Sequence, residues 1–159
     1  MRDAIAYADR IAERPDLASF HARLAAQRFL RDLDGARRHN TWVFDEARAT
    51  RAMLFSAQMP NIKGPDANKP IRFMDWQKFV FANIFGWVEG ATGVRRFRQA
   101  GIFVPKGNGK TTISAPLSMY LTFGEGEGGA EGYAAAVTRD PVNTSADLVR
   151  LAAVALAFH

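Results

Sequence analysis

The chain has 159 residues, of which 23% are charged, and carries a formal net charge of +5. Its length and composition are typical of a soluble globular domain and argue against a disordered chain. It has no cysteine and only three scattered histidines, which excludes disulfides and thiolate metal sites and argues against a histidine metal centre. The N-terminus lacks the apolar run of a signal peptide, and the apolar stretch Leu151–Phe158 is too short to span a bilayer. The sequence therefore predicts a cytoplasmic protein.

Helical periodicity dominates the first sixty residues. Residues 1–40 are predicted to form a helical N-terminal segment in which Pro15 suits a helix start. Apolar residues recur there at helical spacing, namely Leu17, Phe20, Leu24, Leu30 and Leu33. A second helix is predicted from Phe44 to Met59, closed by Pro60 and followed by a loop rich in Gly, Pro and Asn.

A third helix is predicted to begin at Asp75, whose side chain can cap it. Its apolar residues fall on one face of a helical projection: Trp76, Phe79, Val80, Ile84, Trp87 and Val88. Gly90 and Gly93 are predicted to end it.

Residues 94–137 are predicted to form, in order, a strand, a loop, a helix and a second strand. Residues 94–104 are rich in aromatic and β-branched side chains and are predicted to form a strand. The sequence KGNGKTT follows, then a helix from Lys110 to about Phe123, and after GEGEGG a buried strand, YAAAV at 133–137. This order predicts an α/β fold over residues 41–159, with an incomplete parallel sheet of the P-loop NTPase type flanked by helices.

The loop at 104–112 predicts a phosphate-binding site. Gly107 and Gly109 allow backbone N–H groups to turn towards phosphates, and the N-terminus of the following helix favours an anion. Lys110 would reach the β- and γ-phosphates of ATP, and the Thr111 hydroxyl would bind Mg²⁺. The first glycine of the standard pattern G-x-x-x-x-G-K-[ST] is a valine here. The alternative is an ordinary glycine-rich turn.

Asp45 and Glu46 follow the apolar run Trp42–Phe44 and so mimic a Walker B strand. Because they precede the phosphate loop, we interpret them as acids of the first turn of a helix, where the helix dipole stabilises them. No apolar strand ending in an acidic pair follows Val137. These 159 residues are therefore expected to bind ATP but to hydrolyse it inefficiently.

Four blocks resemble, in the same order, the terminase large subunits of tailed phages, the motor ATPases that package viral DNA. They cover roughly residues 41–140 and are WVFDEARATRAMLF, IRFMDWQKFVFANIFGW, TGVRRFRQAGIFVPKGNGKTT and FGEGEGGAEGYAAAVTRD. That family often lacks the first loop glycine and has a basic residue before Asn-Gly-Lys, as VPKGNGKTT does. Since the family's Walker B strand and nuclease domain are not found in the sequence, we expect a truncated product such as a prophage remnant.

The resemblance also implies roles for individual residues. The family's Trp-Gln pair belongs to the adenine pocket, which implies that Trp76 and Gln77 contact adenine; a glutamine amide can pair with adenine N6 and N7. The alternative is that Trp76 is core and Gln77 is a solvated helix residue. Lys106 resembles the family's γ-phosphate sensor. This resemblance implies that Lys106 and Lys110 are catalytic. The alternative is that Lys106 is an exposed lysine at the edge of the loop.

The predicted nucleotide contacts in the loop are Pro105, Lys106, Gly107, Asn108, Gly109, Lys110, Thr111 and Thr112. The implied cofactors are ATP and Mg²⁺. The implied partners are double-stranded viral DNA, the terminase small subunit, the portal and further copies of the motor, in the cytoplasm of the bacterial host.

Two other hypotheses stay open at this point. Between Lys63 and Lys110 nine basic side chains accompany three acidic ones. Arg95, Arg96 and Arg98 could therefore contact DNA, as in a non-catalytic DNA- or partner-binding module, although strand alternation would place Arg96 and Arg98 on one solvated face, opposite Phe97. The other hypothesis is a different P-loop ATPase or kinase. Arg139, after the last predicted strand, is a further candidate for contact with nucleotide or DNA.

Overall fold

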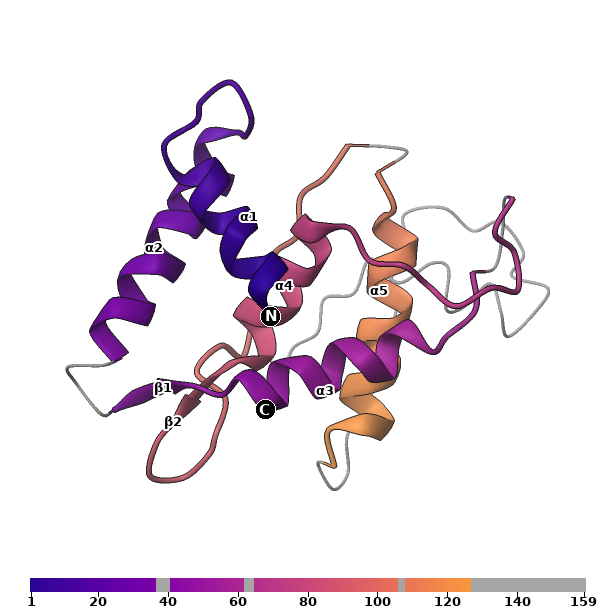
Figure 1. Cartoon of the computed structure of the whole chain (residues 1–159). Coiled ribbons are helices and arrows are strands. Elements are labelled where there is room, and N and C mark those ends of the chain that lie inside the picture. The colour runs from indigo at the N-terminus through magenta and orange to yellow at the C-terminus, as the bar shows by residue number, and fades with distance from the viewer. Residues whose placement is uncertain (37–40, 62–64, 106–107, 127–159) are drawn as a thin grey trace. The chain divides into compact units, whose positions relative to one another are not determined.

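The computed structural model describes residues 1–36, 41–61, 65–105 and 108–126 (Figure 1). The elements in these ranges are α1 (Arg2–Ala12), α2 (Phe20–Ala36), β1 (Trp42–Phe44), α3 (Glu46–Ala57), α4 (Asp75–Phe85), β2 (Trp87–Glu89), α5 (Lys110–Met119) and the π-helical turn η1 (Tyr120–Gly124). The chain divides into two compact units. The first unit comprises Met1–Met53 and Met74–Phe97, and the second comprises Leu54–Phe73 and the described residues from Arg98 onward. The predicted strand at 133–137 and Arg139 lie outside the described residues.

The first unit has a core of small aliphatic and large aromatic side chains. α1 presents Ala4, Ala8 and Ile11 on one face, and α1 packs against both α2 and α4. At the centre, the ring of Phe29 from α2 lies edge-on to Phe79 of α4, with centroids 5.3 Å apart. Because alanines allow close approach of helix backbones, a few aromatic rings fill the remaining space.

Residues 1–36 contain the two helices α1 and α2, whose starts and buried face differ from what the sequence pattern predicts. Pro15 lies in the turn between α1 and α2, and α2 begins at Phe20 after Ser19, whose hydroxyl accepts a hydrogen bond from the Ala22 N–H at 3.4 Å. Phe20 is 61% exposed, and Leu17 and Leu24 are exposed as well. The prediction failed because the face that α2 buries is chosen by the small residues that fit against α1, and spacing alone does not report that fit.

The sheet is two-stranded and antiparallel within the described residues. Trp42 pairs with Glu89, Val43 with Val88 and Phe44 with Trp87. Trp87 and Val88 therefore belong to β2, and the prediction that they continue the third helix is wrong. The helix stops at Phe85 because the pairing with β1 removes the next residues from helical conformation, and the ring of Phe44 occupies the space beside Gly86.

The acidic pair after β1 lies at the start of α3, as predicted. The Asp45 carboxylate accepts a hydrogen bond from the Arg48 N–H at 2.8 Å, and Glu46 is in the first helical turn. The helix begins two residues later than Phe44, because residues 42–44 are held in β1. Both acids are therefore helix-terminal residues in this structure.

The second unit is organised around α5. The fully buried ring of Tyr120 packs on Phe55, with centroids 5.5 Å apart, and the Ser56 hydroxyl lies 3.4 Å from the Pro116 carbonyl. Ile113 and Leu121 are also buried. The predicted helix from Lys110 to about Phe123 agrees with α5 followed by η1.

The strand predicted at 94–104 is not formed. Its only ladder contact in the described residues is an isolated antiparallel bridge between Val88 and Arg95, and residues 99–105 have no regular structure. Phe103 is 96% exposed. A strand requires a neighbour to accept its backbone hydrogen bonds, and the described part of the chain supplies none here. The expected P-loop-type parallel sheet is accordingly not seen in that part; the fold there is α/β with a small antiparallel sheet.

None of the helices in the described ranges is both long enough and apolar enough to cross a membrane.

Candidate functional site

The glycine-rich loop leads directly into α5 in the second unit. Gly109 is the residue before the helix and has φ +69° and ψ +26°, the left-handed conformation that glycine adopts without steric cost. Before it, the Asn108 N–H and side-chain amide both lie 3.4 Å from the Pro105 carbonyl oxygen. Gly109, one of the two loop glycines identified in the sequence, is therefore the left-handed residue that precedes α5.

The N-terminus of α5 has the properties of an anion site. The first N–H groups of an α-helix have no acceptor within the helix, and the helix dipole places partial positive charge there. In α5 the first carbonyl to accept an intrahelical hydrogen bond is that of Gly109, from the Ile113 N–H at 3.2 Å. The first turn contains no acidic residue that would compete with a phosphate.

Several predicted site residues are described only in part. Lys106 and Gly107 lie outside the described residues. Lys110 and Thr111 have helical backbone. Thr112 is half-buried.

Gln77 is buried at the start of α4 in the first unit. It is 1% exposed, and its Oε1 accepts a hydrogen bond from the Met74 N–H at 2.9 Å, so that it closes the first turn of the helix. Among the described residues, its Nε2 has no hydrogen-bond partner. The interpretation of Gln77 as a solvated helix residue is therefore wrong. Leaving a buried donor unpaired is unfavourable by about 1–3 kcal/mol.

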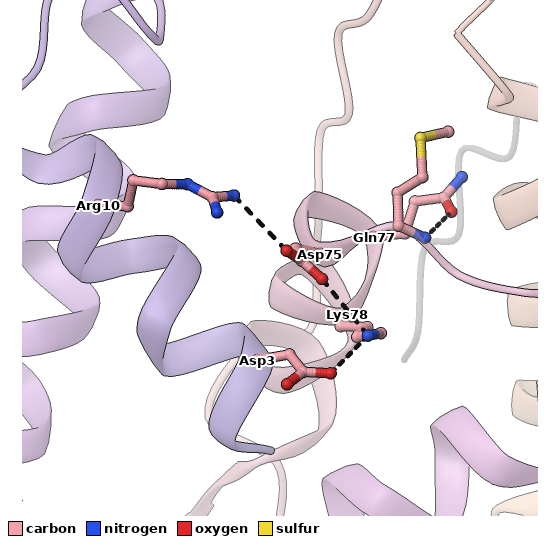
Figure 2. A network of polar contacts seen from close by, with 6 residues as sticks. Asp3, Arg10, Asp75, Gln77 and Lys78 are labelled. Carbon is pink, nitrogen blue, oxygen red and sulfur yellow. Dashed lines mark hydrogen bonds and ion pairs between the residues drawn. The ribbon is translucent and has the colours of Figure 1, made fainter.

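A polar network surrounds the other side of the same helical turn (Figure 2). The Lys78 ammonium lies 2.5 Å from the Asp3 carboxylate of α1 and 3.4 Å from Asp75, while Arg10 of α1 lies 3.5 Å from Asp75. The hydrogen bond to Asp3 raises the pKa of Lys78, and the same contact lowers the pKa of Asp3. The prediction that the Asp75 side chain caps α4 is wrong. Asp75 is the first helical residue, and its carboxylate pairs with cations instead.

The sequence analysis did not identify this network. The spacing of Asp75 and Lys78, three residues apart on a helix, is a signal for their pairing. The long-range partners Asp3 and Arg10 carry no such signal, because the approach of α1 to α4 is a tertiary contact. Trp76, between Asp75 and Gln77, is half-buried.

The arginines considered for DNA contact are not equivalent. Arg95 is 8% exposed, and its guanidinium carbon lies 5.9 Å from the centroid of the Phe85 ring. Arg96 is half-buried and forms an ion pair with Asp32 at 2.9 Å. Only Arg98 is exposed. The interpretation of Arg96 and Arg98 as a solvated strand face is wrong for Arg96, because Asp32 and aromatic rings of the first unit bind its guanidinium.

The comparisons with known proteins give one match. Residues 75–149 match the family model described as terminase large subunit, ATPase domain. No curated protein and no solved structure matches the chain. The matched segment begins with the first residue of α4, includes Gln77 and contains the whole glycine-rich loop with α5. Residues 75–149 of this chain are therefore similar to the ATPase domain of terminase large subunits.

Proposed function

We propose that this chain is the ATP-binding portion of the motor ATPase that packages viral DNA. The observation that carries the proposal is that the family match includes a loop whose last glycine, Gly109, is left-handed and opens a helix free of acidic residues in its first turn. A phosphate group requires such an arrangement of free N–H groups and positive potential. The loop Val104–Thr112 is thus a Walker A phosphate loop in this proposal.

Each loop residue has a distinct task in binding MgATP. Lys110 pairs with the β- and γ-phosphates, the Thr111 hydroxyl ligates Mg²⁺, and Lys106 lies at the γ-phosphate. The remaining contacts are those of backbone groups and small side chains in Pro105, Gly107, Asn108, Gly109 and Thr112. Bound Mg²⁺ neutralises charge on the phosphates, and the two lysines add electrostatic stabilisation as charge develops during phosphoryl transfer.

Gln77 is proposed to recognise adenine. A carboxamide oxygen has two acceptor positions and the nitrogen two donors, so the hydrogen bond from Met74 leaves one acceptor position and the unpaired Nε2 for a base. This combination matches the N6 donor and N7 acceptor of adenine. Trp76, half-buried next to it, is proposed to pack on the ring.

The wider assignment follows the family. We propose that residues 41–159 are an ATPase portion of the P-loop type, and that residues 1–40 form a helical segment preceding it. The proposed partners are double-stranded viral DNA, the terminase small subunit, the portal and further copies of the motor. The proposed location is the cytoplasm of the bacterial host.

The test is equilibrium binding of a non-hydrolysable ATP analogue with Mg²⁺, measured by calorimetry. Lys110→Ala removes the cation at the phosphates and is expected to weaken binding at least about tenfold, since charge-assisted hydrogen bonds contribute about 1.5–3 kcal/mol each. Lys69→Ala is the matched control, because Lys69 is exposed and paired with Asp66 outside the loop sequence. Equal affinity of the Lys110→Ala variant and the control would contradict the phosphate-loop assignment.

A second variant tests whether Gln77 recognises the adenine base. Gln77→Leu keeps the approximate size of the side chain and removes both hydrogen-bonding groups, so it should reduce the preference for ATP over GTP. Unchanged preference, with the fold intact by circular dichroism, would favour a different P-loop ATPase over the terminase-type pocket.

The non-catalytic DNA-binding hypothesis has less support. Two of the three arginines on which it depends are held against rings and a carboxylate of the first unit, which leaves only Arg98 exposed in that cluster. Salt-sensitive DNA binding that is unaffected by ATP and by Lys110→Ala would restore it.

A further inference from the structure

The first turn of α4 has two functional sides. Asp75 and Lys78 are three residues apart and lie towards α1, whereas Gln77 lies on the other side of the turn (Figure 2). The same single turn therefore carries a buried amide on one side and an ion-pair network on the other. Any rotation of this turn moves both sides together.

α1 contacts this turn at two points. Asp3 binds Lys78 at 2.5 Å, and Arg10 lies 3.5 Å from Asp75. Asp3 and Arg10 are seven residues apart, about two helical turns, and so project from the same face of α1. Two contacts separated along one helix restrict rotation of the turn more than a single contact does.

The packing beneath the ion pairs supports the same geometry. The rings of Tyr7 and Phe79 lie 5.6 Å apart between α1 and α4, and the Arg10 guanidinium lies over the Tyr7 ring at 5.5 Å. The charged groups of the network are exposed or half-exposed, and such pairs contribute little to global stability. We therefore expect their main effect to be on the orientation of the first turn of α4.

We propose that Asp3 and Arg10 are positioning residues for nucleotide recognition. Acting through Lys78 and Asp75, they fix the first turn of α4 and thereby the direction in which Gln77 presents its free amide. The Met74–Gln77 hydrogen bond completes the constraint by holding Oε1. This inference rests on the proposed adenine-binding role of Gln77, and none of the four charged residues touches the nucleotide in it.

The experiment compares the affinity of the full chain for MgATP, MgGTP and magnesium tripolyphosphate by calorimetry. Lys78→Met removes the central cation, and Asp3→Asn removes one charge at an exposed position without changing shape. Both are expected to weaken ATP binding about threefold and to lower the ATP-to-GTP preference by the same factor, with no change in tripolyphosphate binding. Lys78→Arg retains the cation and should restore ATP binding.

The control is Asp16→Asn, which breaks an exposed ion pair with Arg14 in the turn between α1 and α2. A drop in tripolyphosphate affinity equal to the drop in ATP affinity would overturn the proposal, because it would indicate a general loss of structure. Unchanged ATP affinity in both Lys78→Met and Asp3→Asn, when the unaltered chain binds ATP, would overturn the positioning role alone. Failure of the unaltered chain to bind ATP would overturn both the proposed function and the positioning role.

Discussion

Arg96 lies among aromatic rings of the first unit. Its guanidinium carbon is 5.0 Å from the centroid of the Phe97 ring, 5.7 Å from that of Trp42 and 5.8 Å from that of Trp87, and its Nη1 donates to the Asp32 carboxylate. Cation–π contact and a partly buried ion pair thus hold the same side chain. This arginine connects the segment after β2 to α2 and to both strands.

Replacing Arg96 with Met should destabilise the chain by about 2–3 kcal/mol, because it removes the cation from three rings and leaves the Asp32 carboxylate unpaired. Urea denaturation followed by circular dichroism would measure this. Arg98→Met is the matched control, since Arg98 is exposed, and it should change stability by no more than about 0.5 kcal/mol. Equal effects of the two substitutions would contradict the inward role of Arg96.

Gly86 is a second position where one residue decides local structure. A Cβ placed there would come within 2.2 Å of the Phe44 ring and 2.6 Å of the Ala82 carbonyl. Gly86→Ala should therefore destabilise the chain by about 1–3 kcal/mol, as overpacking does in a close-packed core.

Gly35, near the end of α2, provides the matched control for Gly86. A Cβ there meets nothing within 4 Å, so Gly35→Ala should stabilise the helix by about 0.5 kcal/mol. Thermal and urea unfolding of both variants would measure the difference. If Gly86→Ala were as stable as the unaltered chain, the close approach of α4 and β1 would be wrong.

At the scale of elements, the contact between α1 and α4 is pH-dependent. Lys78 holds the pKa of Asp3 below its ordinary value of 3.8, and Asp3 raises the pKa of Lys78 above 10.5. The depressed carboxyl pKa means that its stabilisation is present above pH 3.8 and is lost as the pH falls through the lower, folded-state pKa. The raised ammonium pKa means that its stabilisation is present below pH 10.5 and is lost as the pH rises through the higher, folded-state pKa.

The difference in melting temperature between the unaltered chain and Asp3→Asn should therefore be constant between about pH 5 and 9 and should shrink below about pH 4 and above about pH 10.5. Thermal unfolding across this pH range would measure it. For the Asp16→Asn variant, the difference in melting temperature from the unaltered chain should also shrink at acid pH but should not shrink at alkaline pH. The reason is that an arginine, rather than a lysine, lowers the pKa of Asp16. A difference that grows towards acid pH would contradict the Asp3–Lys78 pair.

At the scale of the whole molecule, binding of the proposed nucleotide is expected to raise the stability of the folded chain. A ligand that binds only the folded state raises the unfolding free energy, by about 2.7 kcal/mol at a hundred times its dissociation constant.

Saturating MgATP should accordingly raise the melting temperature of the chain by about 5–10 °C. Differential scanning fluorimetry would measure the shift, with MgGTP expected to give a smaller one and Lys110→Ala expected to give almost none. A shift of the same size in the Lys110→Ala variant would place the ligand away from the phosphate loop.

The sequence by itself determined the features that depend on local chemistry. The glycine-rich loop, the left-handed Gly109 before a helix, the acids at the start of α3 and the helical N-terminal segment all follow from residue type and spacing, because caps, dipoles and glycine conformations act over a few residues. The resemblance to terminases, also visible in the sequence, agrees with the family match at 75–149.

Only the tertiary structure decided what depends on distant partners. Trp87 joined a strand because β1 was there to pair with it, and residues 94–104 stayed irregular because the described chain supplies no neighbouring strand. Arg95 and Arg96 turned inward because aromatic rings and Asp32 were within reach. Asp3 and Arg10 met the first turn of α4 through the packing of α1. Burial and long-range pairing are set by three-dimensional fit, and the linear pattern of residues carries no record of that fit.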